Sequence, residues 1–253
     1  MTEAEWLNGT DPNPAPMFEF LRTERGMART KSGRRKLRLF ACACVRGIWP
    51  LLRRPASREA VETAERVADG LENARQLYLA YSAAGDAIGN ESRQLGKSPF
   101  WHSAEAARHV AANCFDRGDH PSVAHAAYTS ASAWTIDKVG TDRTKRGAQT
   151  RFRNTLRARW AVHADWLRDI VPNPFLPPLR IPRWRTKDLI ELAQTAYEKR
   201  HLPSGHLDAD RLAVLADAVE EAGCQEAVVL DHLRSPGPHL RGCWAVDLLL
   251  GKH

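Results

Sequence analysis

The chain has 253 residues, of which 43% are hydrophobic and 26% charged. These values are typical of one large or two small globular domains and exclude wholesale disorder. No run of 18 apolar residues occurs, and the first dozen residues lack the basic and apolar regions of a secretory signal, so neither a membrane span nor a signal peptide is predicted. The five cysteines are an odd number and widely spread, so we expect a reducing, cytoplasmic environment without a disulfide framework.

The net charge of +7 is distributed unevenly along the chain. Residues 29–58 carry 10 bases and no acid, and residues 143–187 carry 12 bases and 2 acids. Residues 188–253 carry 6 bases and 11 acids. Two interpretations follow: the basic blocks either dock on acidic parts of the same chain or form a basic surface for an acidic partner.

Apolar residues at helical spacing predict helices along nearly the whole chain, and no alternating strand pattern of useful length appears. The fold class is therefore all-α, a multi-helix bundle with a smaller C-terminal helical subdomain. In chain order, the predicted helices cover residues 3–8, 17–25, 34–52, 57–71, 77–88, 101–116, 121–139, 147–171, 186–199, 208–223, 225–234 and 242–250.

A Pro-rich stretch suggests where this bundle divides. Five prolines fall within residues 172–182, and such a segment forms neither a helix nor a central strand. We therefore predict a basic helical bundle over 1–171, a Pro-rich connector over 172–183 and an acidic helical subdomain over 184–253.

Two predicted helices have arginines on a face separate from their apolar face. In the helix over 34–52, Leu37, Phe40 and Cys44 share the apolar face. In the helix over 147–171, a row of arginines would extend about 33 Å at 1.5 Å rise per residue, and Trp166 falls outside the apolar stripe as a candidate exposed contact. The candidate partner-binding residues are Arg35, Arg38, Arg46, Arg146, Arg153, Arg157, Arg168 and Trp166.

These faces favour a non-enzymatic interaction or regulatory module that recognises an acidic protein surface. The alternative is a nucleic-acid-binding protein that uses the same arginines for phosphate contacts. No membrane partner is expected. The chain has no dinucleotide-binding, P-loop or nucleophile-elbow motif, so no catalytic residue is assigned.

A third interpretation is a zinc-binding protein or enzyme centred on residues 224–243. Cys224, His232, His239 and Cys243 lie within this span, separated by seven, six and three residues. Two thiolates and two imidazoles suit tetrahedral zinc. The close Cys pairing of common zinc motifs is missing, and the alternative is that the cysteines pack as small apolar residues. We accordingly expect no cofactor, with zinc at these four residues as the competing hypothesis.

Other cysteines and histidines give weaker patterns. Cys42 and Cys44 are two residues apart, so on a helix they point in different directions and cannot bind one ion together. His102, His109 and His125 lie on Ala-rich predicted helices without a metalloprotease motif. We interpret them as ordinary surface or packed histidines.

Several stretches resemble a heavily duplicated family of uncharacterised planctomycete-type bacterial proteins. They are TEAEWL, TDP, MFEFLR, RKLRLFACACVRGIW, NPFLPP, DRLAVLADAVEEAGC and PGPHLRGCWAVDLLLGK. Residues 208–223 are also similar to a short bacterial repeat-companion domain, with Ala218 where that pattern commonly has an aromatic residue. The resemblance implies no known catalytic activity and no site residues, and it favours an adaptor-like module by analogy.

Overall fold

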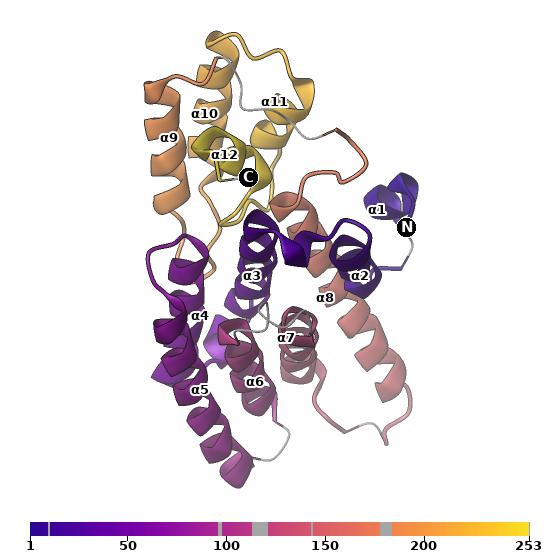
Figure 1. The fold of residues 1–253 in the computed structure, drawn as a ribbon. Coiled ribbons are helices and arrows are strands. Elements are labelled where there is room, and N and C mark those ends of the chain that lie inside the picture. The colour runs from indigo at the N-terminus through magenta and orange to yellow at the C-terminus, as the bar shows by residue number, and fades with distance from the viewer. Residues whose placement is uncertain (10, 96–97, 113–120, 143, 178–183, 253) are drawn as a thin grey trace. The chain divides into compact units, whose positions relative to one another are not determined.

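The computed structural model confirms the all-α class (Figure 1). It describes residues 1–9, 11–95, 98–112, 121–142, 144–177 and 184–252. Within these ranges the chain forms helices and no β-strand. The only bridges are isolated ones in the same ranges, between His201 and His206 and between His206 and Leu240. No helix in the described part of the chain is both long and apolar enough to cross a lipid bilayer.

The chain divides into two compact units, Met1–Ala164 and Asp165–His253. The division falls inside a helix, before the expected connector at 172–183, so residues 165–171 group with the second unit. Residues 178–183 of that connector lie outside the described residues. The helices that begin in the first unit are α1 (Glu3–Asn8), α2 (Ala15–Thr23), η1 (Met27–Arg29), α3 (Lys31–Arg46), η2 (Trp49–Leu51), α4 (Pro55–Ala68), α5 (Ala74–Leu95), α6 (Pro99–Ala111), α7 (Pro121–Val139) and α8 (Ala148–Ile170).

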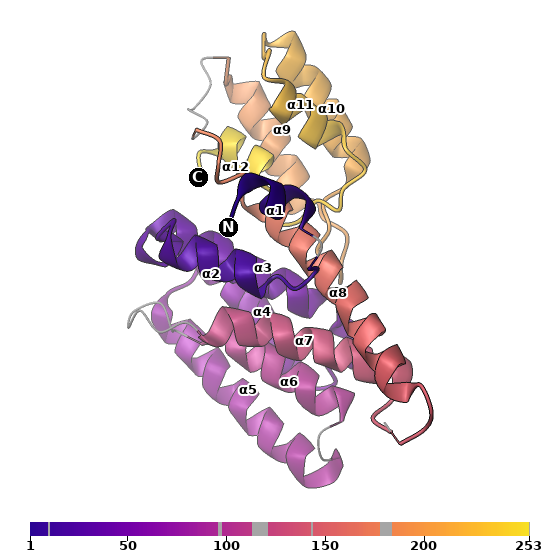
Figure 2. The same ribbon diagram turned by 90° about the vertical axis from the view of Figure 1, so that its right-hand side faces the viewer.

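Helix α3 lies at the centre of the first unit. The Thr30 side chain caps it by accepting a hydrogen bond from the Gly33 N–H, which satisfies a backbone donor that the helix itself cannot pair. Helix α3 packs against α4, α6 and α7, and Figure 2 shows α5, α6 and α7 running side by side. Because α3 has neighbours on several sides, Phe40 and Cys44 are at most 1% exposed.

Two of the predicted solvent-facing arginines of α3 are buried and the third, Arg35, is only 10% exposed, so that prediction was wrong. Arg38 is 7% exposed and Arg46 is 3% exposed. Arg46 forms a paired contact with Glu65 of α4, with Nε–Oε1 at 2.5 Å and Nη2–Oε2 at 2.8 Å. Arg35 pairs with Asp69, Nη2 to Oδ1 at 2.9 Å. The charges of Arg35 and Arg46 are therefore neutralised inside the unit, by carboxylates of α4 and of the residue that ends it.

The Arg46–Glu65 pair generates a stability prediction. Both side chains are at most 3% exposed, so Glu65→Ala removes the carboxylate that compensates a buried guanidinium. Such a change typically costs about 3–5 kcal/mol. We expect a loss of that size in the free energy of unfolding measured with urea, and a smaller loss for Glu65→Gln.

The control is Glu19→Ala, which breaks the exposed Arg22–Glu19 pair of α2. Exposed pairs contribute at most about 1 kcal/mol. Equal losses for Glu65→Ala and Glu19→Ala would contradict the account of α3.

The second unit is smaller and contains the end of α8 together with α9 (Lys187–Glu198), α10 (Ala209–Glu221), α11 (Ala227–Arg234) and α12 (Trp244–Leu250). Asp208 caps α10 by accepting hydrogen bonds from the N–H groups of Asp210 and Arg211. Leu212, Leu215 and Val219 of α10 are fully buried in an apolar core shared with α9, α11 and α12. This core holds the histidine- and cysteine-bearing segments in place.

Candidate metal centre

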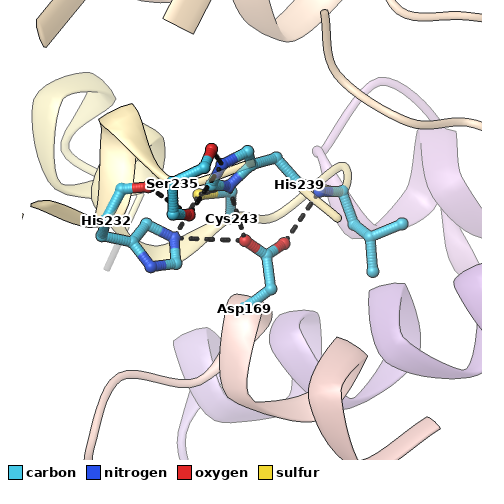
Figure 3. Close-up of polar contacts among 6 residues, drawn as sticks. Asp169, His232, Ser235, His239 and Cys243 are labelled. Atoms are coloured by element: carbon cyan, nitrogen blue, oxygen red, sulfur yellow. Dashed lines mark hydrogen bonds and ion pairs between the residues drawn. The ribbon is translucent and has the colours of Figure 1, made fainter. Parts of the chain in front are cut away.

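Four side chains of the second unit converge on one point. Asp169, His232, His239 and Cys243 each offer one ligand atom, and these atoms lie within 4.8 Å of one another. Figure 3 shows the carboxylate of Asp169 facing the two imidazoles and the thiol. Asp169, His239 and Cys243 are at most 4% exposed, and the His232 side chain is 19% exposed. The cluster is therefore almost closed to solvent.

Each side chain comes from a different place in the chain. Asp169 lies in the last turn of α8, and His232 lies in the last turn of α11. The turn after α11 carries His239, and Cys243 is the residue immediately before α12. Backbone bonds fix this turn: the Leu207 N–H donates to the His239 carbonyl at 2.8 Å, and the Cys243 N–H donates to the Leu240 carbonyl at 2.8 Å.

Four of the separations between ligand atoms are close to the edges of a zinc tetrahedron. Asp169 Oδ1 is 3.2 Å from His232 Nε2 and 3.1 Å from His239 Nδ1. Cys243 Sγ is 3.2 Å from His232 Nε2 and 3.9 Å from His239 Nδ1. Zinc bonds of about 2.0–2.3 Å give tetrahedral edges of about 3.3–3.7 Å. These four separations lie within about 0.2 Å of that range, and all the ligand atoms lie within 4.8 Å of one another.

A second layer of hydrogen bonds orients two of the ligands. Asp169 Oδ2 accepts a hydrogen bond from the Leu240 N–H at 2.8 Å, which leaves Oδ1 toward the cluster. His239 Nε2 is 3.0 Å from the Ser235 carbonyl oxygen. Because a carbonyl only accepts, Nε2 carries a hydrogen. Nδ1 then donates to Asp169 when the ring is protonated, and it offers a lone pair to a metal ion when the ring is neutral. Outer partners of this kind are typical of metal-binding histidines.

The electrostatics of the cluster are those of a buried carboxylate paired with imidazoles. Burial alone would raise the pKa of Asp169, but hydrogen bonds from His232 and His239 outweigh it and lower that pKa. Burial opposes protonation of His239, yet its bond to Asp169 raises the His239 pKa. Burial raises the pKa of Cys243 well above its ordinary value. A metal cation would replace the proton between carboxylate and imidazole and would deprotonate the thiol.

The sequence identified three of these four residues. Cys224 is buried in the apolar core instead, where it follows the left-handed Gly223 that ends α10. It is not a member of the cluster. Asp169 was missed because it lies 63 residues before His232, and no local spacing links a helix end to a distant turn. Asp169 is one of only two acids in the basic block 143–187, and that was the available signal.

The remaining candidates separate into buried and exposed residues. Trp166 is 4% exposed, with its ring centre 6.3 Å from that of His206, so the exposed contact predicted for it is wrong. Arg168 is half-buried and pairs with Asp165 at 2.7 Å, Nη1 to Oδ1. Arg146, Arg153 and Arg157 are exposed. Only the latter three remain as a basic surface among the predicted arginines.

Comparison of the chain with protein-family models, curated proteins and solved structures found no match. The resemblances seen in the sequence therefore stay predictions.

The geometry predicts the spectrum of a cobalt-substituted protein. Co²⁺ reports both coordination number and thiolate ligation, because a tetrahedral site gives intense visible bands and a Co–S bond adds a near-ultraviolet charge-transfer band. We expect both features in the wild-type chain. Cys243→Ser should remove the charge-transfer band, because the sulfur is replaced by oxygen.

Cys224→Ser provides a matched control, since Cys224 is a buried cysteine of the same unit. Its cobalt spectrum should equal that of the wild type. Loss of the charge-transfer band in Cys224→Ser, with retention in Cys243→Ser, would show that the assigned thiol is wrong.

Proposed function

We propose that this protein binds one zinc ion in its second unit, through Asp169, His232, His239 and Cys243. The observation that supports the proposal is the spacing of four ligand atoms at 3.1–3.9 Å, measured over four of their separations. Two imidazoles, a thiol and a carboxylate are all established zinc ligands. A hard ion such as magnesium prefers oxygen ligands, so the donor set favours zinc over magnesium or calcium.

The role that we propose for this ion is structural rather than catalytic. Catalytic zinc has three protein ligands and an open position for water or substrate, whereas structural zinc has four protein ligands. Here the protein supplies all four, and three of the four residues are almost fully buried. This supports the expectation of a non-enzymatic module.

The ion would connect parts of the second unit that few other contacts join. The four ligands belong to the end of α8, the end of α11 and the turn that leads into α12. Helices α11 and α12 pack weakly against each other, compared with the contact between α10 and α11. A shared ion is a strong cross-link in this part of a small unit, and small units gain most from such links.

Metal removal is the direct test. Free zinc at 1,000 times its dissociation constant would stabilise the folded unit by about 4 kcal/mol. For a unit of this size that corresponds to a fall of about 15 °C or more in Tm when the metal is chelated. We expect about one zinc per chain after purification without chelator, and a lower calorimetric Tm for the second unit after chelation.

Asp169→Asn and Cys224→Ser make this test specific. Asp169→Asn keeps the side-chain size and removes the charge, so it should lose zinc and lower the Tm. Cys224→Ser should retain zinc. A wild-type protein that contains no zinc, takes up none, and has the same Tm with and without chelator would refute the proposal.

We also propose that the first unit recognises an acidic partner through Arg146, Arg153 and Arg157. All three side chains are exposed. The chain has no acidic residue between Asp142 and Asp165, so no carboxylate of the same segment competes for them. The other predicted row is not part of this proposal, because Arg38 and Arg46 are buried and Arg35 pairs with Asp69.

A further inference from the structure

An aromatic pocket opens in the first unit, beside the exposed arginines of α8. Its volume is about 280 Å³. Four aromatic side chains line it: Phe18 of α2, Phe40 of α3, Tyr128 of α7 and Trp160 of α8. None of the lining residues is acidic. This volume is just below the usual range of about 300–1,000 Å³ for drug-sized ligands, so the pocket suits one small flat group.

The aromatic groups that border the pocket are reachable from solvent. Tyr128 is 55% exposed and Trp160 is half-buried. Large aromatic rings are usually buried when they serve only the core. A ring that is open on one side and backed by Phe18 and Phe40, both at most 5% exposed, is a platform on which another ring can stack.

Two arginines stand on the same face of α8 as Trp160. Arg153, Arg157 and Trp160 are spaced i, i+4 and i+7, so the three side chains form one ridge along the helix. The ridge is about 10.5 Å long at 1.5 Å rise per residue. Arg146 precedes the helix and extends the positive charge beyond it. The pocket and the cations are therefore neighbours on one helix.

From this arrangement we infer that the first unit binds single-stranded nucleic acid, with a base in the aromatic pocket and the adjoining phosphates on Arg153 and Arg157. This inference rests on the proposed recognition of an acidic partner and names its chemistry. Aromatic platforms beside a row of cations are the common means of binding single strands without sequence preference. Arginine pairs with phosphate through two parallel hydrogen bonds.

A single strand fits this site better than a duplex or an acidic protein. In a duplex each base is already stacked between neighbours, so none is free to enter a pocket on a helix surface. An acidic protein surface would pair with the arginines, but its carboxylates would not stack in an aromatic pocket. Only a chain that alternates flat rings with anions occupies both features along the ridge.

The test is fluorescence anisotropy of labelled oligo(dT), with the full-length zinc-loaded protein. Phosphate contacts from Arg153 and Arg157 predict a slope of about −1.4 for log affinity against log salt, at about −0.7 per contact on single strands. An abasic oligonucleotide of the same length should bind at least about five-fold more weakly, because it lacks the stacking base. Poly-glutamate should not compete at equal charge concentration.

Matched variants distinguish the contribution of the pocket to binding from that of positive charge in general. Tyr128→Ala should weaken oligo(dT) binding about five-fold or more, whereas Tyr78→Ala, at a 64% exposed tyrosine of α5, should leave it unchanged. The double variant Arg153→Glu, Arg157→Glu should abolish binding at moderate salt. A double variant made at exposed arginines of the first unit away from α8, Arg75→Glu with Arg29→Glu, should bind nearly as the wild type.

The outcomes distinguish this inference from the broader proposal. Poly-glutamate binding that depends on Arg153 and Arg157, without oligonucleotide binding, would overturn the nucleic-acid inference and leave recognition of an acidic partner standing. Equal affinity for the abasic and the normal oligonucleotide would also overturn it. If neither polymer binds at low salt, both proposals fail.

Discussion

The second unit depends on one buried carboxylate that two imidazoles and a thiol share. Asp169 is 4% exposed, and a charge at that depth persists only when it is paired or bound to a cation. A protonated histidine would also compensate this charge. That pairing would involve the carboxylate and the imidazoles but would leave the nearby thiol without a role. One divalent ion bound by all four side chains, as proposed, would compensate this charge, and their ligand atoms lie within 4.8 Å of one another.

The sequence predicted what depends on local periodicity and missed what depends on packing between helices. The all-α class and helices such as α9 and α10 follow from apolar spacing and from caps such as Thr186 and Asp208. The burial of Arg46 does not, because a helical wheel shows which residues share a side but not how many helices surround them. Its carboxylate partner, Glu65, lies on the next helix.

The candidate site shows the same division. His232, His239 and Cys243 are close in sequence, and their residue types alone suggested zinc. Cys224 was included because it is near them in sequence, although Gly223 ends α10 and Cys224 turns into the core. Asp169 completes the set from a distant helix end, and only the fold places it there.

The central claim is that zinc is held by one sulfur and three nitrogen or oxygen atoms. X-ray absorption at the zinc edge, measured on the zinc-loaded protein, counts these ligands directly. The account predicts one sulfur at about 2.3 Å and three lighter atoms at about 2.0–2.2 Å. Two sulfurs, which would make Cys224 a ligand, or a shell of six oxygens from loosely bound ion would contradict it.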